Sequence, residues 1–164
     1  MRNMAKIGQF IYPWGNGHYS RMMRLNEKLK ELGDNEFHYF SKGDIYQKLL
    51  DKFPDEKQNI HEVLMPTPID GKFGPSLRKS LWNFLLPVEG NEPLVTQISS
   101  YLKDEGKLYN KIGFDLVIND GDMGSNVLAE RRNITSLFVT NQFKPKIWKS
   151  RIYFKQALEF VSNQ

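Results

Sequence analysis

Short apolar runs alternate with segments of helical periodicity along most of this chain. The strands predicted by the apolar runs are residues 7–12, 37–40, 60–64, 116–119 and 135–140. The helices predicted by apolar residues three and four positions apart are 22–32, 45–53, 77–86, 94–109 and 126–132. This alternation is typical of a parallel sheet covered by helices. We therefore predict an α/β, Rossmann-like fold with helices on both faces of the sheet.

Two segments depart from the alternation. Residues 65–75 hold three prolines and two glycines, which predicts a loop. Near the C-terminus, Ile147, Phe154 and Leu158 fall on one helical face, among five basic residues between positions 144 and 155. We expect residues 1–142 to form one domain and residues 143–164 a basic amphipathic helix. That helix either covers its own sheet or packs against a second domain that this chain lacks.

The composition is that of one globular domain. A chain of 164 residues can bury a full core without a disulfide or metal, and the absence of cysteine excludes a thiolate zinc site. The net charge of +4 indicates nucleic acid only weakly, and no aromatic platform or recognition helix supports that partner. No apolar run approaches the roughly 18 residues that cross a bilayer, and no signal-peptide pattern is present. We expect a cytoplasmic protein.

The predicted turn after the first strand, residues 13–20, carries unusual chemistry. In an open α/β sheet, ligands bind beyond the carboxyl ends of the strands. Gly15 and Gly17 let the backbone approach a ligand closely, and His18, placed where the next helix begins, can accept a proton near neutral pH. A dinucleotide-binding loop would have a third glycine where Ser20 stands, so NAD is not predicted. The alternative interpretation is that His18 merely caps the helix.

A second candidate loop follows the strand at residues 116–119. It offers Asp120 and Asp122, and a carboxylate there could orient an imidazole and stabilise its charged form. The alternative is that one aspartate caps the following helix. His38 and His61 lie inside predicted strands, where a structural or surface position is expected. No spacing of histidines and carboxylates predicts a metal site.

Together, the two loops resemble a known pattern. Residues 10–21, Phe-Ile-Tyr-Pro-Trp-Gly-Asn-Gly-His-Tyr-Ser-Arg, look like the first strand, loop and helix of GT-B glycosyltransferases, which carry a Gly-Gly-His or Gly-His element there. Residues 114–120 resemble their later strand, which ends in an aspartate, and residues 137–142 the next strand with its terminal polar pair. The chain is similar to the families of the peptidoglycan N-acetylglucosaminyltransferase and of the UDP-glycosyltransferases, as an N-terminal, acceptor-side domain.

The resemblance implies a role for each matching residue. In inverting UDP-glycosyltransferases the histidine at this turn deprotonates the acceptor hydroxyl, which implies that role for His18, and the aspartate that holds it would be Asp120. Asp122 is a second candidate for the holding carboxylate. The substrate-binding candidates are Gly15, Asn16, Gly17, Ser20, Asp122, Asn141 and Gln142. No cofactor and no metal are implied. Trp14 and Asn16 depart from the small residues of the usual glycine loop.

The resemblance also implies a nucleotide-sugar donor, which a second domain absent from this chain would bind. The acceptor would be a glycan, a lipid-linked sugar or a small molecule. The chain is then a fragment, one half of a split enzyme, or a non-catalytic relative, and we expect no turnover by the chain alone. The alternative function is a Rossmann-like module that binds a nucleotide or a protein without chemistry. Only the enzyme requires His18 and Asp120 or Asp122 to converge in one cleft.

Residues 77–86 mix two cations, a tryptophan and aliphatic side chains in a window of helical length. Such a segment can lie at a bilayer surface, which would place the protein peripherally on the cytoplasmic membrane. The alternative is a core helix with a basic start.

Overall fold

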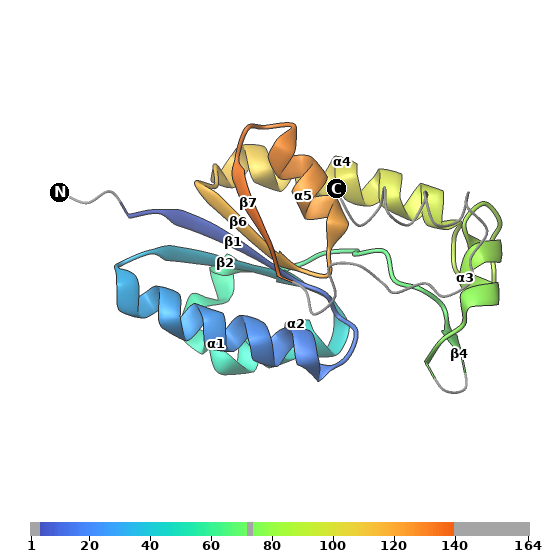
Figure 1. Cartoon of the computed structure of the whole chain (residues 1–164), viewed down its shortest axis with the longest axis horizontal. Coiled ribbons are helices and arrows are strands. Elements are labelled where there is room, and N and C mark those ends of the chain that lie inside the picture. The colour runs from blue at the N-terminus through green and yellow to red at the C-terminus, as the bar shows by residue number, and fades with distance from the viewer. Residues whose placement is uncertain (1–3, 72–73, 140–164) are drawn as a thin grey trace, which may run out of the picture.

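One five-stranded parallel sheet organises the protein, in the strand order β3-β2-β1-β6-β7 (Figure 1). The computed structural model describes residues 4–71 and 74–139. The strands of the sheet are β1 (Lys6–Ile11), β2 (Glu36–Ser41), β3 (Ile60–Glu62), β6 (Leu116–Asp120) and β7 (Thr135–Val139). The predicted α/β, Rossmann-like fold is therefore confirmed.

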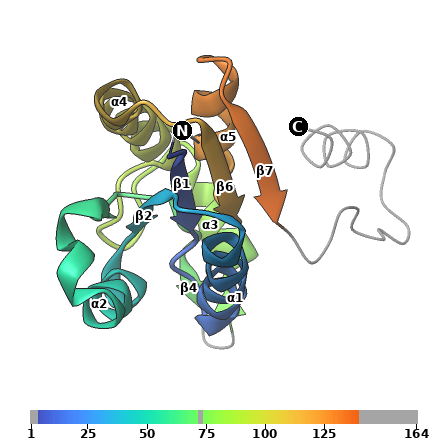
Figure 2. The same ribbon diagram turned by 90° about the vertical axis from the view of Figure 1, so that its left-hand side faces the viewer.

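The helices cover both faces of this sheet. They are α1 (Asn16–Leu32), α2 (Gly43–Lys52), α3 (Leu77–Asn83), α4 (Leu94–Ile112) and α5 (Met123–Glu130), with a 3-10 segment, η1, at Pro54–Asn59. Figure 2 shows α1 and α2 on one side and α4 and α5 on the other. Successive strand residues point to opposite faces, so β1 supplies Ile7 and Ile11 to the first core and Phe10 to the second.

The central strand, β1, contributes buried side chains to the cores on both faces of the sheet. Five of the six residues of β1 are buried, because β2 and β6 flank it and helices cover both of its faces. On the α4 side, the rings of Phe10 and Phe40 stack with centroids 4.3 Å apart, and Tyr109 and Phe114 close around them. On the α1 side, Met22 of α1 packs with Tyr39 of β2.

The register brings the loops after β1 and β6 together. Ile11 is opposite Asp120, and Asp120 is opposite Val139, so these strands end level with one another. The backbone amide of Tyr12 donates to the Asp120 carbonyl at 3.1 Å, which continues this alignment one residue beyond β1. The two loops with candidate chemistry therefore share one edge of the sheet.

Several boundaries differ from the prediction. Helix α1 begins at Asn16, close to the start expected at His18 and before the apolar period that begins at Met22, because apolar periodicity marks only the residues that face the core. The loop 65–75 contains a short antiparallel hairpin, β4 (Asp70–Gly71) with β5 (Gly74–Pro75). Figure 1 shows α3 and β4 beyond the carboxyl ends of the strands.

Residues 143–164, predicted as a separate helix, lie outside the described part of the chain. No helix within that part is long and apolar enough to cross a membrane.

Candidate active site

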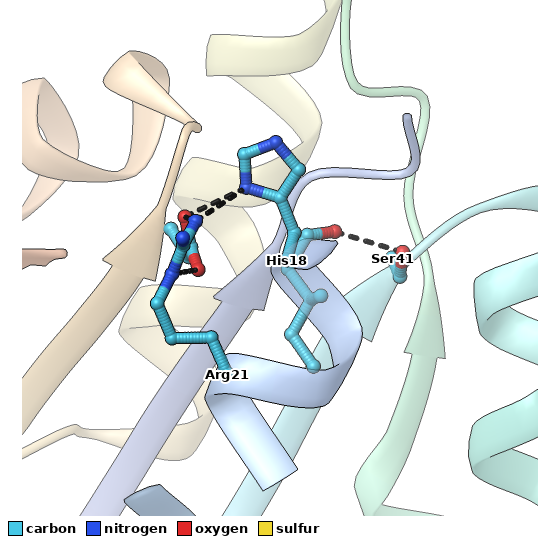
Figure 3. A network of polar contacts seen from close by, with 5 residues as sticks. His18, Arg21 and Ser41 are labelled. Carbon is cyan, nitrogen blue, oxygen red and sulfur yellow. Dashed lines mark hydrogen bonds and ion pairs between the residues drawn. The ribbon is translucent and has the colours of Figure 1, made fainter. Parts of the chain in front are cut away.

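His18 occupies the first turn of α1, at the carboxyl edge of the sheet. Its Nδ1 lies 2.7 Å from Oδ1 of Asp120, the last residue of β6 (Figure 3). The imidazole keeps 27% of its surface exposed, whereas the Asp120 carboxylate keeps 1%. The structure therefore brings together the histidine and the first of the two candidate aspartates, 102 residues apart in the chain.

Arg21 completes the cluster, and the sequence analysis missed it. Its Nε donates to Asp120 Oδ2 at 2.6 Å and its Nη2 donates to Oδ1 at 2.7 Å, which is a two-pronged ion pair (Figure 3). The available signal was helical spacing, since Arg21 follows His18 by three positions and lies on the same face of α1. An arginine on a helix is usually a solvated surface charge, which is why spacing alone did not single it out.

These contacts keep the buried carboxylate ionised. Burial alone would raise the pKa of Asp120, but hydrogen bonds from His18 and Arg21, together with their charges, outweigh it and lower the pKa below its ordinary value. An ionised carboxylate only accepts, so the short contact places a proton on His18 Nδ1. The lone pair of the neutral imidazole is then on Nε2. Figure 3 shows this second nitrogen turned away from Asp120 and Arg21.

Asp122, the second candidate carboxylate, serves a different purpose. It caps α5 by accepting from the amides of Gly124 and Ser125, and it accepts the hydroxyl of Tyr101 at 2.5 Å. It is 4% exposed. The capping interpretation thus applies to Asp122, and the pairing with His18 belongs to Asp120.

The remaining candidates of the first loop surround the start of α1. Gly15 precedes the helix with a φ of 78°, a conformation that favours glycine, and no side chain caps the helix there. Asn16 accepts from Lys48 Nζ at 2.5 Å. Gly17 and Ser20 are exposed in the first turns. The start of α1 is thus open and carries no acidic side chain in its first turn. Asn141 and Gln142 lie outside the described residues.

A second histidine cluster sits within the sheet, away from this edge. His38 of β2 contacts His61 Nε2 through Nδ1 at 3.2 Å and Glu36 Oε1 through Nε2 at 2.9 Å. Burial, and then the neighbouring His38 and Lys111, lower the pKa of His61 to about 4. Both histidines belong to the packing of the sheet, beside Phe40 and Phe114. Within residues 4–71 and 74–139, no group of three or more histidines and carboxylates is arranged to hold a metal.

A cavity of about 370 Å³ is lined in part by Tyr12 and Gly121, two neighbours of His18. Gly121, which follows Asp120 with a φ of 89°, forms part of its wall, and a methyl group there would lie 3.1 Å from His18 Cε1. Tyr12 lines the same cavity, and its ring meets the imidazole edge-on at a centroid distance of 5.7 Å. Tyr12 and Gly121 therefore lie between the imidazole of His18 and this cavity, in contact with both.

The segment predicted as a membrane-surface helix is exposed rather than buried. Its outward side chains, between 50% and 67% accessible, are Leu81, Trp82, Phe84, Leu85 and Leu86. The core-helix alternative is wrong for these residues.

Membrane contact stays a prediction, and sedimentation with anionic vesicles tests it. Trp82→Ala and Leu85→Ala should each reduce binding, and unchanged binding would count against the contact.

Comparison with known proteins identifies the fold. No protein-family model matches the sequence, and no curated protein matches it significantly. Solved structures do match. A UDP-N-acetylglucosamine 2-epimerase superposes with a TM-score of 0.59 at 14% identity, over 98% of this chain and 39% of its own.

Two glycosyltransferases also superpose, each at 18% identity. One, from Rickettsia africae ESF-5, has a TM-score of 0.51 over 98% of this chain and 35% of its own. The other, the calicheamicin glycosyltransferase CalG4, has a TM-score of 0.50 over 99% of this chain and 38% of its own. The chain therefore spans well under half the length of these proteins. It has the fold of one GT-B half-domain.

Proposed function

We propose that this chain is the acceptor-binding half of a glycosyltransferase that moves a sugar from a nucleotide-diphosphate sugar to an acceptor hydroxyl. The observation that carries the proposal is the 2.7 Å contact between His18 Nδ1 and Asp120 at the carboxyl edge of the sheet. A base whose one ring nitrogen is held by a buried carboxylate, while the other is turned away from that contact (Figure 3), is the arrangement that general-base catalysis needs.

In this mechanism, His18 Nε2 takes the proton of the acceptor hydroxyl as its oxygen attacks the anomeric carbon of the donor. The new bond forms as the bond from that carbon to the nucleoside diphosphate breaks, and the diphosphate leaves with the bonding electrons. The anomeric configuration is inverted because attack and departure occur on opposite sides. Asp120 is a positioning residue, which holds the tautomer of His18 and stabilises the imidazolium as it forms.

Arg21 supports the same step through Asp120. Its two donors keep the carboxylate ionised at a site where burial favours the neutral acid. A neutral Asp120 could not stabilise the imidazolium.

The donor would be bound by a second half-domain. The chain spans 35% to 39% of the three superposed proteins, so a donor-binding half of comparable size, on the same or on a separate polypeptide, is part of the proposal. The exposed amides at the start of α1 are suited to a phosphate at the junction of the halves. We expect the chain alone to transfer nothing.

The test is a transfer assay on the complete enzyme, the chain together with its donor-binding half, over a panel of nucleotide sugars that begins with UDP-N-acetylglucosamine. Loss of the base should lower the rate constant by about 10²- to 10⁴-fold in His18→Ala. Asp120→Asn should cause a comparable loss while the donor KM stays unchanged. A complete enzyme that transfers sugar equally well without His18 refutes the assigned base. An assembly that binds nucleotide sugar but never transfers it supports the non-catalytic binding module.

A further inference from the structure

Strand β7 is exposed on both faces, which is unusual in a parallel sheet. The first four of its five residues are exposed, whereas four of the five residues of the neighbouring strand β6 are buried. Leu137 and Phe138 keep 52% and 41% of their surfaces accessible. The strand, Thr-Ser-Leu-Phe-Val, has none of the charges or prolines that protect the edge of a sheet. An apolar parallel strand of this kind is normally covered on its faces by further chain.

The pairing with β6 shows which face each side chain of β7 occupies. Residues directly opposite each other in a sheet point to the same face. Phe138 is opposite Asn119, which is opposite Phe10, a residue of the core on the α4 side. Leu137 is opposite Ile118, a residue of the core on the α1 side. Two adjacent apolar side chains of β7 therefore represent the two faces separately.

Residues 140–164 follow β7 directly in the chain. The sequence predicts residues 143–164 as an amphipathic helix with Ile147, Phe154 and Leu158 on its apolar face, and this segment lies outside the described residues. Residues 140–142 are a short tether to β7. A short tether keeps a segment at an effective concentration of about a millimolar, which a second copy of the chain would have to match in solution. The segment is thus the favoured occupant of the exposed strand.

The direction of the chain decides which face of β7 the segment reaches. The crossover from β6 outward to β7 passes through α5, on the α4 side of the sheet (Figure 2). Crossovers between parallel strands have one hand in nearly all proteins, so those that step in the same direction along a sheet lie on the same face. A helix that continues outward from β7 therefore lies beside α5, over Phe138 and not over Leu137.

We propose that residues 143–164 form a helix that packs on β7 beside α5, with Ile147, Phe154 and Leu158 facing Phe138. The inference decides between the two alternatives for this segment, because the helix covers its own sheet and does not need a second domain to bury its apolar face. It does not depend on the proposed function.

The experiment is disulfide cross-linking in the full chain, which has no cysteine of its own. One cysteine is placed on β7, as Phe138→Cys or as Leu137→Cys. The second is placed on the apolar face of the segment, in turn as Ile147→Cys, Phe154→Cys and Leu158→Cys. A disulfide needs Cβ atoms about 3.5–4.5 Å apart, so only side chains that face each other are linked under mild oxidation.

We expect Phe138→Cys to form a disulfide within the chain with at least one of the three partners, and Leu137→Cys with none. The proposal is overturned if Leu137→Cys links as well as Phe138→Cys, or if neither links. A denaturing gel separates internal disulfides from those between chains. Linked dimers in place of the internal disulfide identify a second copy as the occupant, which also overturns the proposal.

Trypsin digestion measures the packing without a cross-link, because five basic residues lie between positions 144 and 155. Cleavage there follows the fraction of molecules in which the segment is detached. Phe154→Ser removes an apolar contact and should raise the cleavage rate by about tenfold or more. Ile152→Ser is the matched control, since Ile152 is also apolar but lies about 160° around the helix from Phe154. Equal cleavage rates in the two variants overturn the assigned face.

Discussion

The molecule contains two pairings of a histidine with a carboxylate, and only one of them is suited to catalysis. His18 and Asp120 are 2.7 Å apart, and His38 and Glu36 are 2.9 Å apart, so the contact itself does not distinguish them. The difference lies at the second nitrogen. In His38 that nitrogen meets His61 inside the sheet, whereas in His18 it is turned away from Arg21 (Figure 3). A pair becomes chemically useful when one nitrogen is held and the other can reach a substrate.

The largest expected effects distinguish the two pairs, because His18 should support the transfer rate and His38 the stability of the fold. His18→Ala should abolish most transfer by the complete enzyme and change the free energy of unfolding by less than about 1 kcal/mol. His38→Ala should destabilise the fold by about 1–3 kcal/mol, because it leaves a cavity and unpaired neighbours, and the transfer rate should stay unchanged. Urea unfolding and initial rates measure the two effects. A stable His38→Ala protein with lost activity would contradict the comparison.

The next effect tests how closely the cavity wall approaches His18. Gly121 and Gly113 both have positive φ, 89° and 71°, but only at Gly121 would a methyl group meet neighbours, 3.0 Å from Tyr12 and 3.1 Å from His18. Both alanine variants should lose about 1–2 kcal/mol of stability from backbone strain. Only Gly121→Ala should also shift the imidazole NMR signals of His18. Equal shifts in Gly113→Ala would mean that the strain, not the contact, disturbs the site.

The cluster of Glu36, His38 and His61 within the sheet predicts that the stability of the protein depends on pH below about 6.5. The pKa of His61 is about 4 in the folded protein against 6.5 in the unfolded chain, so only the unfolded chain is protonated between these values. Stability should therefore fall as the pH drops from 6.5 toward 4. His61→Phe keeps the ring beside Phe40 and removes the titration. The urea midpoint of this variant should depend less on pH in that window than that of the wild type, and identical slopes would contradict the prediction.

A dependence of opposite sign is expected from Glu105 of α4. Burial, and then the charges of Asp122 and Asp104, raise its pKa to about 8. Its folded form therefore keeps a proton that the unfolded chain releases near pH 4.5, and its contribution to stability is lost as the pH rises toward 8. Glu105→Gln cannot release that proton. The stability of this variant relative to the wild type should rise between pH 5 and 8, as measured by thermal unfolding.

The fold was largely predictable because it depends on local patterns. Apolar runs located all five strands of the sheet within a few residues, and the three central strands, β1, β2 and β6, are the ones these runs fill with buried residues. The start of α1 near His18 was predicted from the glycine-rich turn, since the first turn, from Asn16, has no apolar period of its own. For residues 77–86 the sequence left a surface helix and a core helix both open, because leucine and tryptophan suit either. The tertiary structure shows Leu81 and Trp82 to be exposed among the described residues.

The site was predictable only in part, because its contacts cross about 100 residues of chain. The sequence indicated His18, Asp120 and Asp122 as candidates. It did not indicate which of the two aspartates contacts His18. That choice depends on the φ of 89° at Gly121, which turns the chain so that the two carboxylates enter different surroundings. No sequence pattern indicated Arg21 as a site residue, because its partner, Asp120, lies 99 residues away in the chain.

The position of β1 at the centre of the sheet has a consequence for how the protein is made. Its neighbour on one side, β6, pairs Leu116 with Ile7, so 109 residues must be synthesised after Ile7 before that edge can be covered. At about 5–20 residues per second, synthesis leaves the edge of the most buried strand unpaired for about 5–20 s on the ribosome. An apolar strand with free backbone amides is a template for association with other chains during that time. The sequence separation of β1 and β6 thus leaves a time window during synthesis in which this strand edge has no partner on the β6 side.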